Sequence, residues 1–178
     1  MEAANSTAKL VQSAETDIDW EAEYQRSLPK VYRYFSFWVG DRSTAEDLTS
    51  ATFEKAWSSR RHFNSDRGSV ISWLLGIARN VKADHFRNRR RAGILDEAET
   101  LPTTGSVEDS VQLNSDFDRM GQLLRKLSER DRELVALKYG AALTNRRIAE
   151  MTGLTESNVG TILHRVVRRL RAQWEELS

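Results

Sequence analysis

The sequence predicts an all-α protein of two small helical domains, joined by a flexible acidic linker, with a helix-turn-helix domain second. Apolar residues recur at three- and four-residue spacing, which is typical of amphipathic helices. Only 9 glycines and 2 prolines occur among 178 residues, and no sustained strand-like alternation is present. A hydrophobic content of 39% supports real but modest cores, as two small domains would need.

The first domain is expected to begin with a helical region over residues 20–39. We expect an interruption near Pro29, because an interior proline removes a helical hydrogen bond. Ser43 and Glu46 have the spacing of a capping box, which predicts that a second helix starts there. A third and longer helix is expected from Ser69 onward.

The loop RRHFNSDRG, residues 60–68, places cations beside an aromatic ring. Arg60, Arg61 and Arg67 could hold phosphates while Phe63 stacks on a base, a combination that suits single-stranded nucleic acid. Phe63 could equally anchor the loop on the core. Both interpretations of this side chain stay open at this point.

The stretch SVISWLLGIARNVKADHFRNRRR, residues 69–91, predicts a helix with two different sides. One side is apolar and should face the first core: Val70, Leu74, Ile77, Ala78 and Val81. The other side is small or polar: Ser72, Gly76, Arg79, Asn80, Ala83 and Arg87. An interior glycine costs about 1 kcal/mol relative to alanine. Either another backbone must approach this side, or Gly76 and Ala83 pack against a neighbouring helix.

The chain is expected to divide into four parts: an N-terminal extension (1–17), a first domain (18–92), a linker (93–112) and a second domain (113–178). The linker is rich in glycine, acidic and small polar residues. Helices are expected after it over residues 111–126, 129–138, 145–151 and 156–173. Ser128, Thr144 and Thr155 are placed to cap the last three.

The stretch TNRRIAEMTGLTESNVGTILHRVVRRLR, residues 144–171, predicts a helix-turn-helix. Gly153 provides the conformational freedom that its tight turn needs. The inner faces are expected to hold Ile148, Ala149, Val159, Ile162, Leu163, Val166 and Leu170. The outer face of the second helix presents Ser157, Thr161, His164, Arg165 and Arg168. These side chains can reach base edges and phosphates in a major groove, which predicts DNA binding.

Charge is distributed in blocks, although the net charge is only +1. Residues 1–59 carry −4, residues 60–92 carry +7, residues 93–121 carry −6 and residues 122–178 carry +4. Two basic blocks on one chain suggest two contacts with a polyanion.

Several classes of site find no support in the sequence. The chain contains no cysteine, so disulfides and thiolate metal sites are absent, and its three histidines are scattered. We expect no metal, cofactor or catalytic residue. No signal peptide or membrane span is apparent either, which fits a cytoplasmic protein.

The two basic blocks, in this order, resemble the extracytoplasmic-function (ECF) sigma factors of bacterial RNA polymerase. The resemblance rests on GDRSTAEDLTSATFEKAW, ISWLLGIARNVKADHFRNRRR, LSERDRELVALKYG and the helix-turn-helix with HRVVRRLR. It implies that the first domain is sigma region 2, which docks on the clamp helices of the largest polymerase subunit and reads melted minus-ten DNA. The second would be region 4, which reads the minus-thirty-five duplex, and the polymerase flap is a further implied contact.

The resemblance assigns residues by position. For minus-ten DNA they are Arg61, Phe63, Trp73, Arg79, Asn80 and Arg87, to which the pattern of the loop adds Arg60. For the minus-thirty-five element they are Thr161, His164 and Arg165, to which the pattern of the outer face adds Ser157 and Arg168. The docking and core-forming helix contains Asp47, Leu48, Phe53 and Trp57. The first three are assigned to polymerase binding, although Phe53 and Trp57 are expected in the core more than in contact.

Two positions depart from the family pattern. Ser50-Ala51 stands where the family often has Gln-Glu, within the expected docking surface. Gly160 stands where the recognition helix often has a lysine or arginine, so promoter preferences cannot be transferred to this chain. The resemblance also leaves open whether an anti-sigma factor holds the chain inactive.

Two other classes of function compete with this one. A stand-alone helix-turn-helix regulator would share the second domain but would bind duplex DNA without polymerase. A nucleic-acid enzyme would have to use Glu46, Asp47 and Glu54, which fit a solvated helix face better because no histidine or phosphate loop accompanies them. The first domain also argues for polymerase as a partner: opening about ten base-pair steps at about 1.4 kcal/mol each is beyond one small domain.

Overall fold

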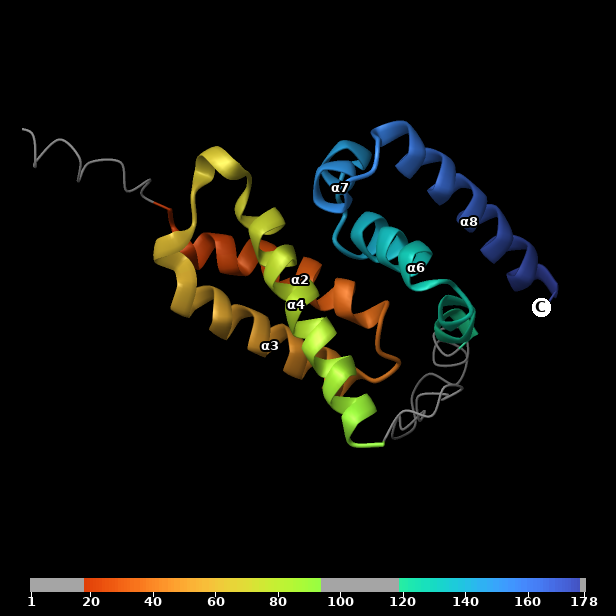
Figure 1. Cartoon of the computed structure of the whole chain (residues 1–178), viewed down its shortest axis with the longest axis horizontal. Helices are drawn as coiled ribbons and strands as arrows, with labels where there is room; N and C mark the ends of the chain where they lie inside the picture. Colours follow the sequence, from red (N-terminus) through yellow and green to blue (C-terminus); the bar gives the residue numbers. More distant parts are fainter. Residues whose placement is uncertain (1–17, 94–118, 177–178) are drawn as a thin grey trace, which may run out of the picture.

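The computed structural model describes residues 18–93 and 119–176, and these are helical and connecting segments with no strand among them (Figure 1). The predicted all-α fold with a helix-turn-helix is therefore confirmed. The N-terminal extension, nearly all of the predicted linker, and residues 111–118 of the expected helix over 111–126 lie outside the described residues. No helix in the described ranges is long and apolar enough to cross a membrane.

The first region is built from three helices around one core. These are α2 (Trp20–Ser36), α3 (Arg42–Ser59) and α4 (Val70–Arg91). Two single turns of 3-10 helix join α3 to α4: η1 (Arg60–His62) and η2 (Ser65–Arg67). Tyr34, Phe35 and Leu75 are fully buried where the helices meet. The loop predicted over residues 60–68 is thus a pair of short turns.

Helix α2 runs through Pro29 without a break, so the predicted interruption is wrong. Burial of Val31, Tyr34 and Phe35 on the following turns stabilises the helix by more than the lost hydrogen bond costs. The helix ends at Ser36, where the amides of Trp38 and Val39 turn back onto the carbonyl of Phe35.

The predicted capping box at the start of α3 is also wrong. Asp41 is the N-cap, because its carboxylate accepts the amides of Ser43 and Thr44, each at 3.0 Å. Glu46 instead pairs with Arg42 one turn away, at 2.8 Å. Asp41, two residues earlier in the chain, therefore takes the role expected of Ser43.

The second region begins with helical residues 119–125 and continues through α6 (Glu129–Val135), α7 (Asn145–Thr152) and α8 (Glu156–Glu176). The predicted helix over residues 129–138 changes after Val135 into a π-helical turn, η3 (Ala136–Gly140). The side chains of Ser128, Thr144 and Thr155 accept amides three residues ahead, which confirms all three predicted caps.

The two regions pack against each other over a continuous core. Turn η3 lies on α2, and α4 meets α7. At Gly140 the approach is so close that a Cβ would lie 3.0 Å from the carbonyl oxygen of Arg33 and 3.1 Å from the Cα of Tyr34. Sequence patterns do not predict this contact.

Candidate nucleic-acid interfaces

The helix-turn-helix has the predicted internal packing. Gly153 ends α7 with φ of 72°, a left-handed conformation that favours glycine. The residues buried inside the motif are Ile148, Ala149, Val159, Ile162, Leu163 and Val166, and Leu170 is half-buried. This packing fixes which side of α8 faces outward.

The outward side of α8 carries the five predicted side chains, all of them exposed: Ser157, Thr161, His164, Arg165 and Arg168. Thr161 donates its hydroxyl to the carbonyl of Ser157 at 3.0 Å. Arg165 lies 3.8 Å from the carboxylate of Asp131, while its side chain stays 67% exposed. A long exposed helix with polar and cationic groups on one side has the shape that a major groove accepts.

Helix α4 has the two predicted sides, with one addition and one change. Leu75 is fully buried although it was not predicted, and Ile77 is only half-buried. A Cβ on Gly76 would meet no heavy atom within 4 Å. The described structure therefore gives no packing reason for this glycine.

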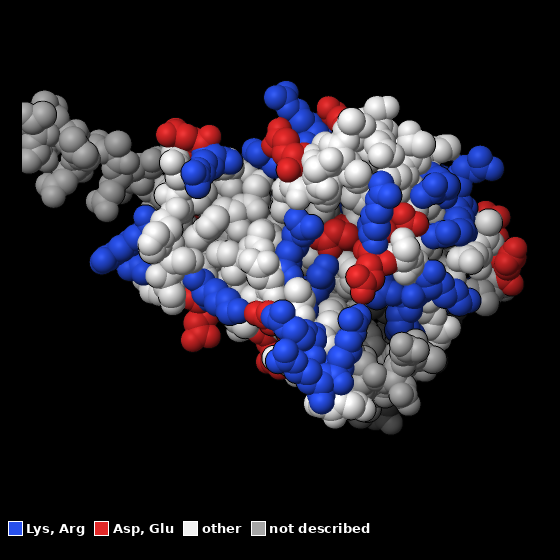
Figure 2. Space-filling model, viewed as in Figure 1, with Lys and Arg blue, Asp and Glu red and all other residues white. Residues whose placement is uncertain are grey.

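The C-terminal end of α4 is strongly basic and faces outward (Figure 2). Arg87 is exposed and pairs with Asp84 on the same helix. Arg90 approaches Glu129 of α6 at 3.6 Å, but both side chains remain mostly exposed. Exposed pairs of this kind contribute little to stability, so these arginines are available to phosphates.

An aromatic cluster holds the loop between α3 and α4. The ring centroid of Phe63 lies 5.4 Å from that of Trp73 and 5.9 Å from that of Trp20. Phe63 is half-buried, so it anchors the loop on the first core. Arg61 is exposed beside this anchor.

Trp57 was expected in the core and is instead 58% exposed. It lies at the end of α3, and the guanidinium of Arg60 stacks over its ring at 3.9 Å. This cation–π pair offers a flat, charged surface next to the loop.

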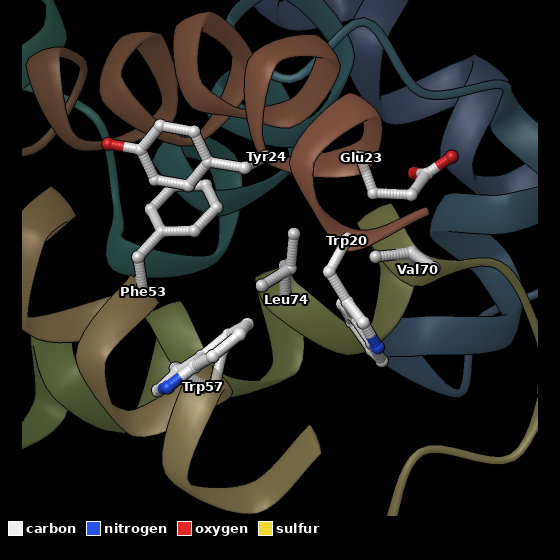
Figure 3. Close-up of a pocket in the computed structure, with 8 residues that line it drawn as sticks. Trp20, Glu23, Tyr24, Phe53, Trp57, Val70 and Leu74 are labelled. Carbon is white, nitrogen blue, oxygen red and sulfur yellow. The ribbon is translucent and has the colours of Figure 1, made fainter. Parts of the chain in front are cut away.

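The three predicted polymerase-docking residues are divided between the inside and the outside of α3. Asp47 is exposed, whereas Leu48 is 7% exposed and belongs to the core. Phe53 packs on Tyr24 at 4.7 Å and lines an apolar hollow of about 200 Å³ between α2, α3 and α4 (Figure 3). Trp57 lines the same hollow. Helix α3 therefore carries both the apolar side chains of this hollow and the exposed carboxylate of Asp47.

The seven predicted minus-ten residues are not equally accessible, because Arg79 is held by the second region. Its Nε lies 3.0 Å from Oε1 of Glu133, and it donates from Nη1 to the carbonyl of Met151 at 2.9 Å. Lys82, one turn along α4, pairs with the other oxygen of Glu133. Asn80, in contrast, is exposed.

The surroundings of Glu133 also shift two pKa values. Burial, and then the Glu133 carboxylate, raise the pKa of Tyr34 well above its usual value. Burial lowers the pKa of Lys82, although Glu133 acts in the opposite direction. The ammonium of Lys82 also lies 3.5 Å from the ring centroid of Trp38.

Sequence reasoning missed this cluster of Tyr34, Lys82 and Glu133. The one available signal was an acidic residue directly before the apolar run LVAL, on a helix that must bury a face. A buried carboxylate requires partners, but its position does not say which ones.

Comparisons with known proteins match both regions. The family Sigma-70 region 2 matches residues 24–92, and Sigma-70, region 4 matches residues 117–170. The ECF RNA polymerase sigma factor BldN of Streptomyces coelicolor is 31% identical over 94% of this chain and 67% of its own length. SigL of Mycobacterium tuberculosis, also an ECF RNA polymerase sigma factor, is 28% identical over 88% of this chain and 89% of its own length.

Solved structures show the same fold. The sigma factor RpoE of Bartonella quintana, in complex with the anti-sigma factor NepR, superposes with a TM-score of 0.68 at 22% identity, over 88% of this chain and 97% of its own. CnrH, in complex with the cytosolic domain of CnrY, gives a TM-score of 0.60 at 23% identity, over 88% and 86%. Sigma factors bind core RNA polymerase and promoter DNA. The chain belongs to the ECF RNA polymerase sigma factors and is an alternative sigma factor that directs promoter-specific transcription initiation.

Proposed function

We propose that promoter recognition in this sigma factor is divided between residues 18–92, as region 2, and residues 113–178, as region 4, with residues 93–112 as the linker. The observation that carries the proposal is the outer side of α8, where five polar and cationic side chains are exposed over a fully packed inner stripe. The basic end of α4 supports a second, separate contact with DNA.

Region 4 reads the minus-thirty-five duplex through α8. Arg165 makes a bidentate contact with a guanine, since it is exposed and its distance from Asp131 leaves it free to turn. Ser157, Thr161 and His164 contact neighbouring base edges. Arg168 contacts a phosphate, which fixes the position of the helix without reading sequence.

Region 2 holds the melted minus-ten strand along α4 and the loop before it. Arg79 and Asn80 contact the strand beside Gly76, where the open space admits another backbone. Arg60, Arg61 and Arg87 contact phosphates. The aromatic pair of Phe63 and Trp73 gives this loop a fixed shape.

Region 2 docks on the polymerase through α3. Asp47 is exposed and Phe53 is half-buried beside the apolar hollow, while Leu48 packs in the core. The clamp helices of the largest subunit would take this face and the flap would take region 4. Core polymerase is needed because strand separation costs about 1.4 kcal/mol per step.

Three narrower statements complete the proposal. The chain catalyses no reaction itself and needs no cofactor or metal. It works in the cytoplasm, where its polymerase partner transcribes. An anti-sigma factor controls it, by analogy with the sigma factor RpoE, whose solved structure is a complex with the anti-sigma factor NepR.

Transcription from a library of promoters, by core polymerase with and without this chain, tests the proposal. We expect a set of promoters to be used only when the chain is present. Transcripts that do not depend on the chain, or binding to core no stronger than that of an unrelated basic protein, would contradict it. Tight duplex binding without polymerase would favour a stand-alone regulator.

A further inference from the structure

The carboxylate of Glu133 is the polar centre of the contact between the two regions. The hydroxyl of Tyr34 donates to its two oxygens at 3.1 and 3.0 Å. Arg79 contacts one oxygen at 3.0 Å and Lys82 contacts the other. All three partners belong to region 2, whereas Glu133 belongs to α6 of region 4.

These groups are shielded from water more than any other ion pair in the described ranges. The Glu133 side chain is 10% exposed and that of Lys82 is 14% exposed, compared with 69% and 85% for Arg90 and Glu129. A shielded pair is screened little by salt, and removing one partner leaves a buried charge without compensation. Removing Glu133 should therefore disturb the contact between the regions far more than removing the exposed partner of Arg90 would.

The same contact also binds Arg79, a side chain that we propose contacts DNA. Arg79 is bound on two sides by region 4, by Glu133 and by the carbonyl of Met151 at the end of α7. A carboxylate between an arginine and a lysine satisfies them as a phosphate would. The Nε and Nη1 donors that Glu133 and Met151 occupy are therefore not available to a DNA strand.

Apolar packing surrounds this polar centre. Leu137 of η3 is fully buried in the core that both regions share, and η3 lies against α2. The backbone approach at Gly140 leaves no room for a side chain. The contact is thus a fitted surface with an ionic centre.

We propose that in the free chain region 4 closes over region 2 as an autoinhibitory contact, in which Glu133 takes the place of the DNA backbone on Arg79. Capture of the minus-ten strand then requires the two regions to separate. The part that concerns DNA rests on the proposed function of Arg79, and the part that concerns closure does not.

Closure is tested on the full chain by energy transfer between two dyes. The sequence contains no cysteine, so Ser50→Cys on α3 and Ala172→Cys on α8, both at exposed positions, can be labelled without background. Glu133→Arg places a third cation beside Arg79 and Lys82, so we expect the transfer efficiency to fall while the helix content in circular dichroism is kept. Unchanged transfer in both Glu133→Arg and Glu133→Gln would overturn the proposal.

Occlusion is tested with a fluorescein-labelled oligo(dT) single strand. Glu133→Gln should bind it about tenfold more tightly than the wild type, because Arg79 loses its competing carboxylate. Glu21→Gln is the matched control, since it makes the same charge change at an exposed position of α2 and should show no such gain. Adding Arg79→Ala to Glu133→Gln should abolish the gain. A gain that is equal in the control, or that survives loss of Arg79, would overturn occlusion.

The two proposals fail in different ways. With saturating core polymerase, Glu133→Gln should direct as much transcription as the wild type, because the polymerase holds the regions apart. A wild-type chain that directs no transcription would refute the proposed function and leave the energy-transfer result standing. Loss of closure in Glu133→Arg with no gain in strand binding by Glu133→Gln would overturn occlusion and contradict the minus-ten role of Arg79.

Discussion

The two candidate DNA surfaces of this protein are kept in opposite states. The outer side of α8 is open, with Arg165 67% exposed, whereas Arg79 on α4 is held by Glu133 and Met151. Both helices carry arginines on a polar side, so composition does not explain the difference. Duplex DNA is present before a promoter opens, but a melted strand is not. The surface with an available target is left open, and the surface whose target must first be produced is covered.

The largest expected effect comes from the apolar part of the closed contact. Leu137→Ala should lower the free energy of unfolding by about 2–5 kcal/mol, because it leaves a cavity at a fully buried position. Tyr139→Ala, at a 51% exposed position of the same turn, should cost much less. Urea titration followed by circular dichroism measures both. Two separate transitions, with only region 4 shifted by Leu137→Ala, would show that the regions do not support each other.

The open surface should show its effect in base preference rather than stability. Arg165→Ala should weaken promoter binding by about 1–3 kcal/mol and relax preference at one or two positions of the minus-thirty-five element. Holoenzyme binding to a set of promoter variants measures this. If the loss is the same on every sequence, Arg165 contacts a phosphate and the recognition role belongs to its neighbours.

The basic end of α4 should behave as an open surface although it belongs to region 2. Replacing Arg89, Arg90 and Arg91 with glutamine should reduce the salt slope by about 0.7 for each single-strand contact and about 0.9 for each duplex contact. The reduction should be similar in the wild type and in Glu133→Gln, because region 4 reaches this end only through the exposed pair of Arg90 with Glu129. A reduction seen only in Glu133→Gln would show that the closed contact extends further along α4.

Adjacent residues of α4 provide a sharper comparison. Arg79→Ala should lower the stability of the free chain by about 1 kcal/mol, since Glu133 keeps two other partners, whereas Asn80→Ala should not change it. Both should impair open-complex formation, measured by footprinting, without weakening binding to core.

A template with a premelted minus-ten bubble then separates the possible roles of Asn80. Full recovery of Asn80→Ala on the bubble would mean that Asn80 helps opening, and a persistent, base-dependent defect would mean that it reads a base. Wild-type behaviour on both templates would remove this side of α4 from DNA binding.

The smallest effect concerns pH. Burial, and then the nearby Arg89, lower the pKa of His85 below its usual value. As the pH falls through about 6.5, the unfolded chain takes up a proton before the folded chain does, so the free energy of unfolding decreases. His85→Gln should reduce that decrease between neutral and mildly acidic pH, while His62→Gln, at an exposed position, should not. An identical pH dependence in all three proteins would contradict the assignment to His85.

Sequence signals that act within a few residues predicted most of the helix ends, turns and buried helix faces of this structure. Thr144, Gly153 and the apolar stripe of α8 identified the helix-turn-helix, because caps, a left-handed turn and helical periodicity act within a few residues. Errors arose where neighbours compete or where tertiary packing decides. Asp41 caps α3 in place of Ser43, and burial of the turns after Pro29 keeps α2 whole.

The covered surface on α4 could not be predicted in the same way. It depends on pairs such as Arg79 with Glu133 and Arg33 with Gly140, which are far apart in sequence and lie on opposite sides of the linker. Periodicity shows that α6 must bury a face, but it does not identify what that face meets. The sequence therefore suggested candidate residues, but it did not reveal the contacts that hold Arg79.

The shared core also bears on the lifetime of the protein. When the two regions separate, apolar surface around Leu137 and along α2 meets water unless another protein covers it. Open chains outside the polymerase would therefore be exposed to proteases and to aggregation. We therefore expect the open form of this sigma factor to persist only while a partner covers that surface.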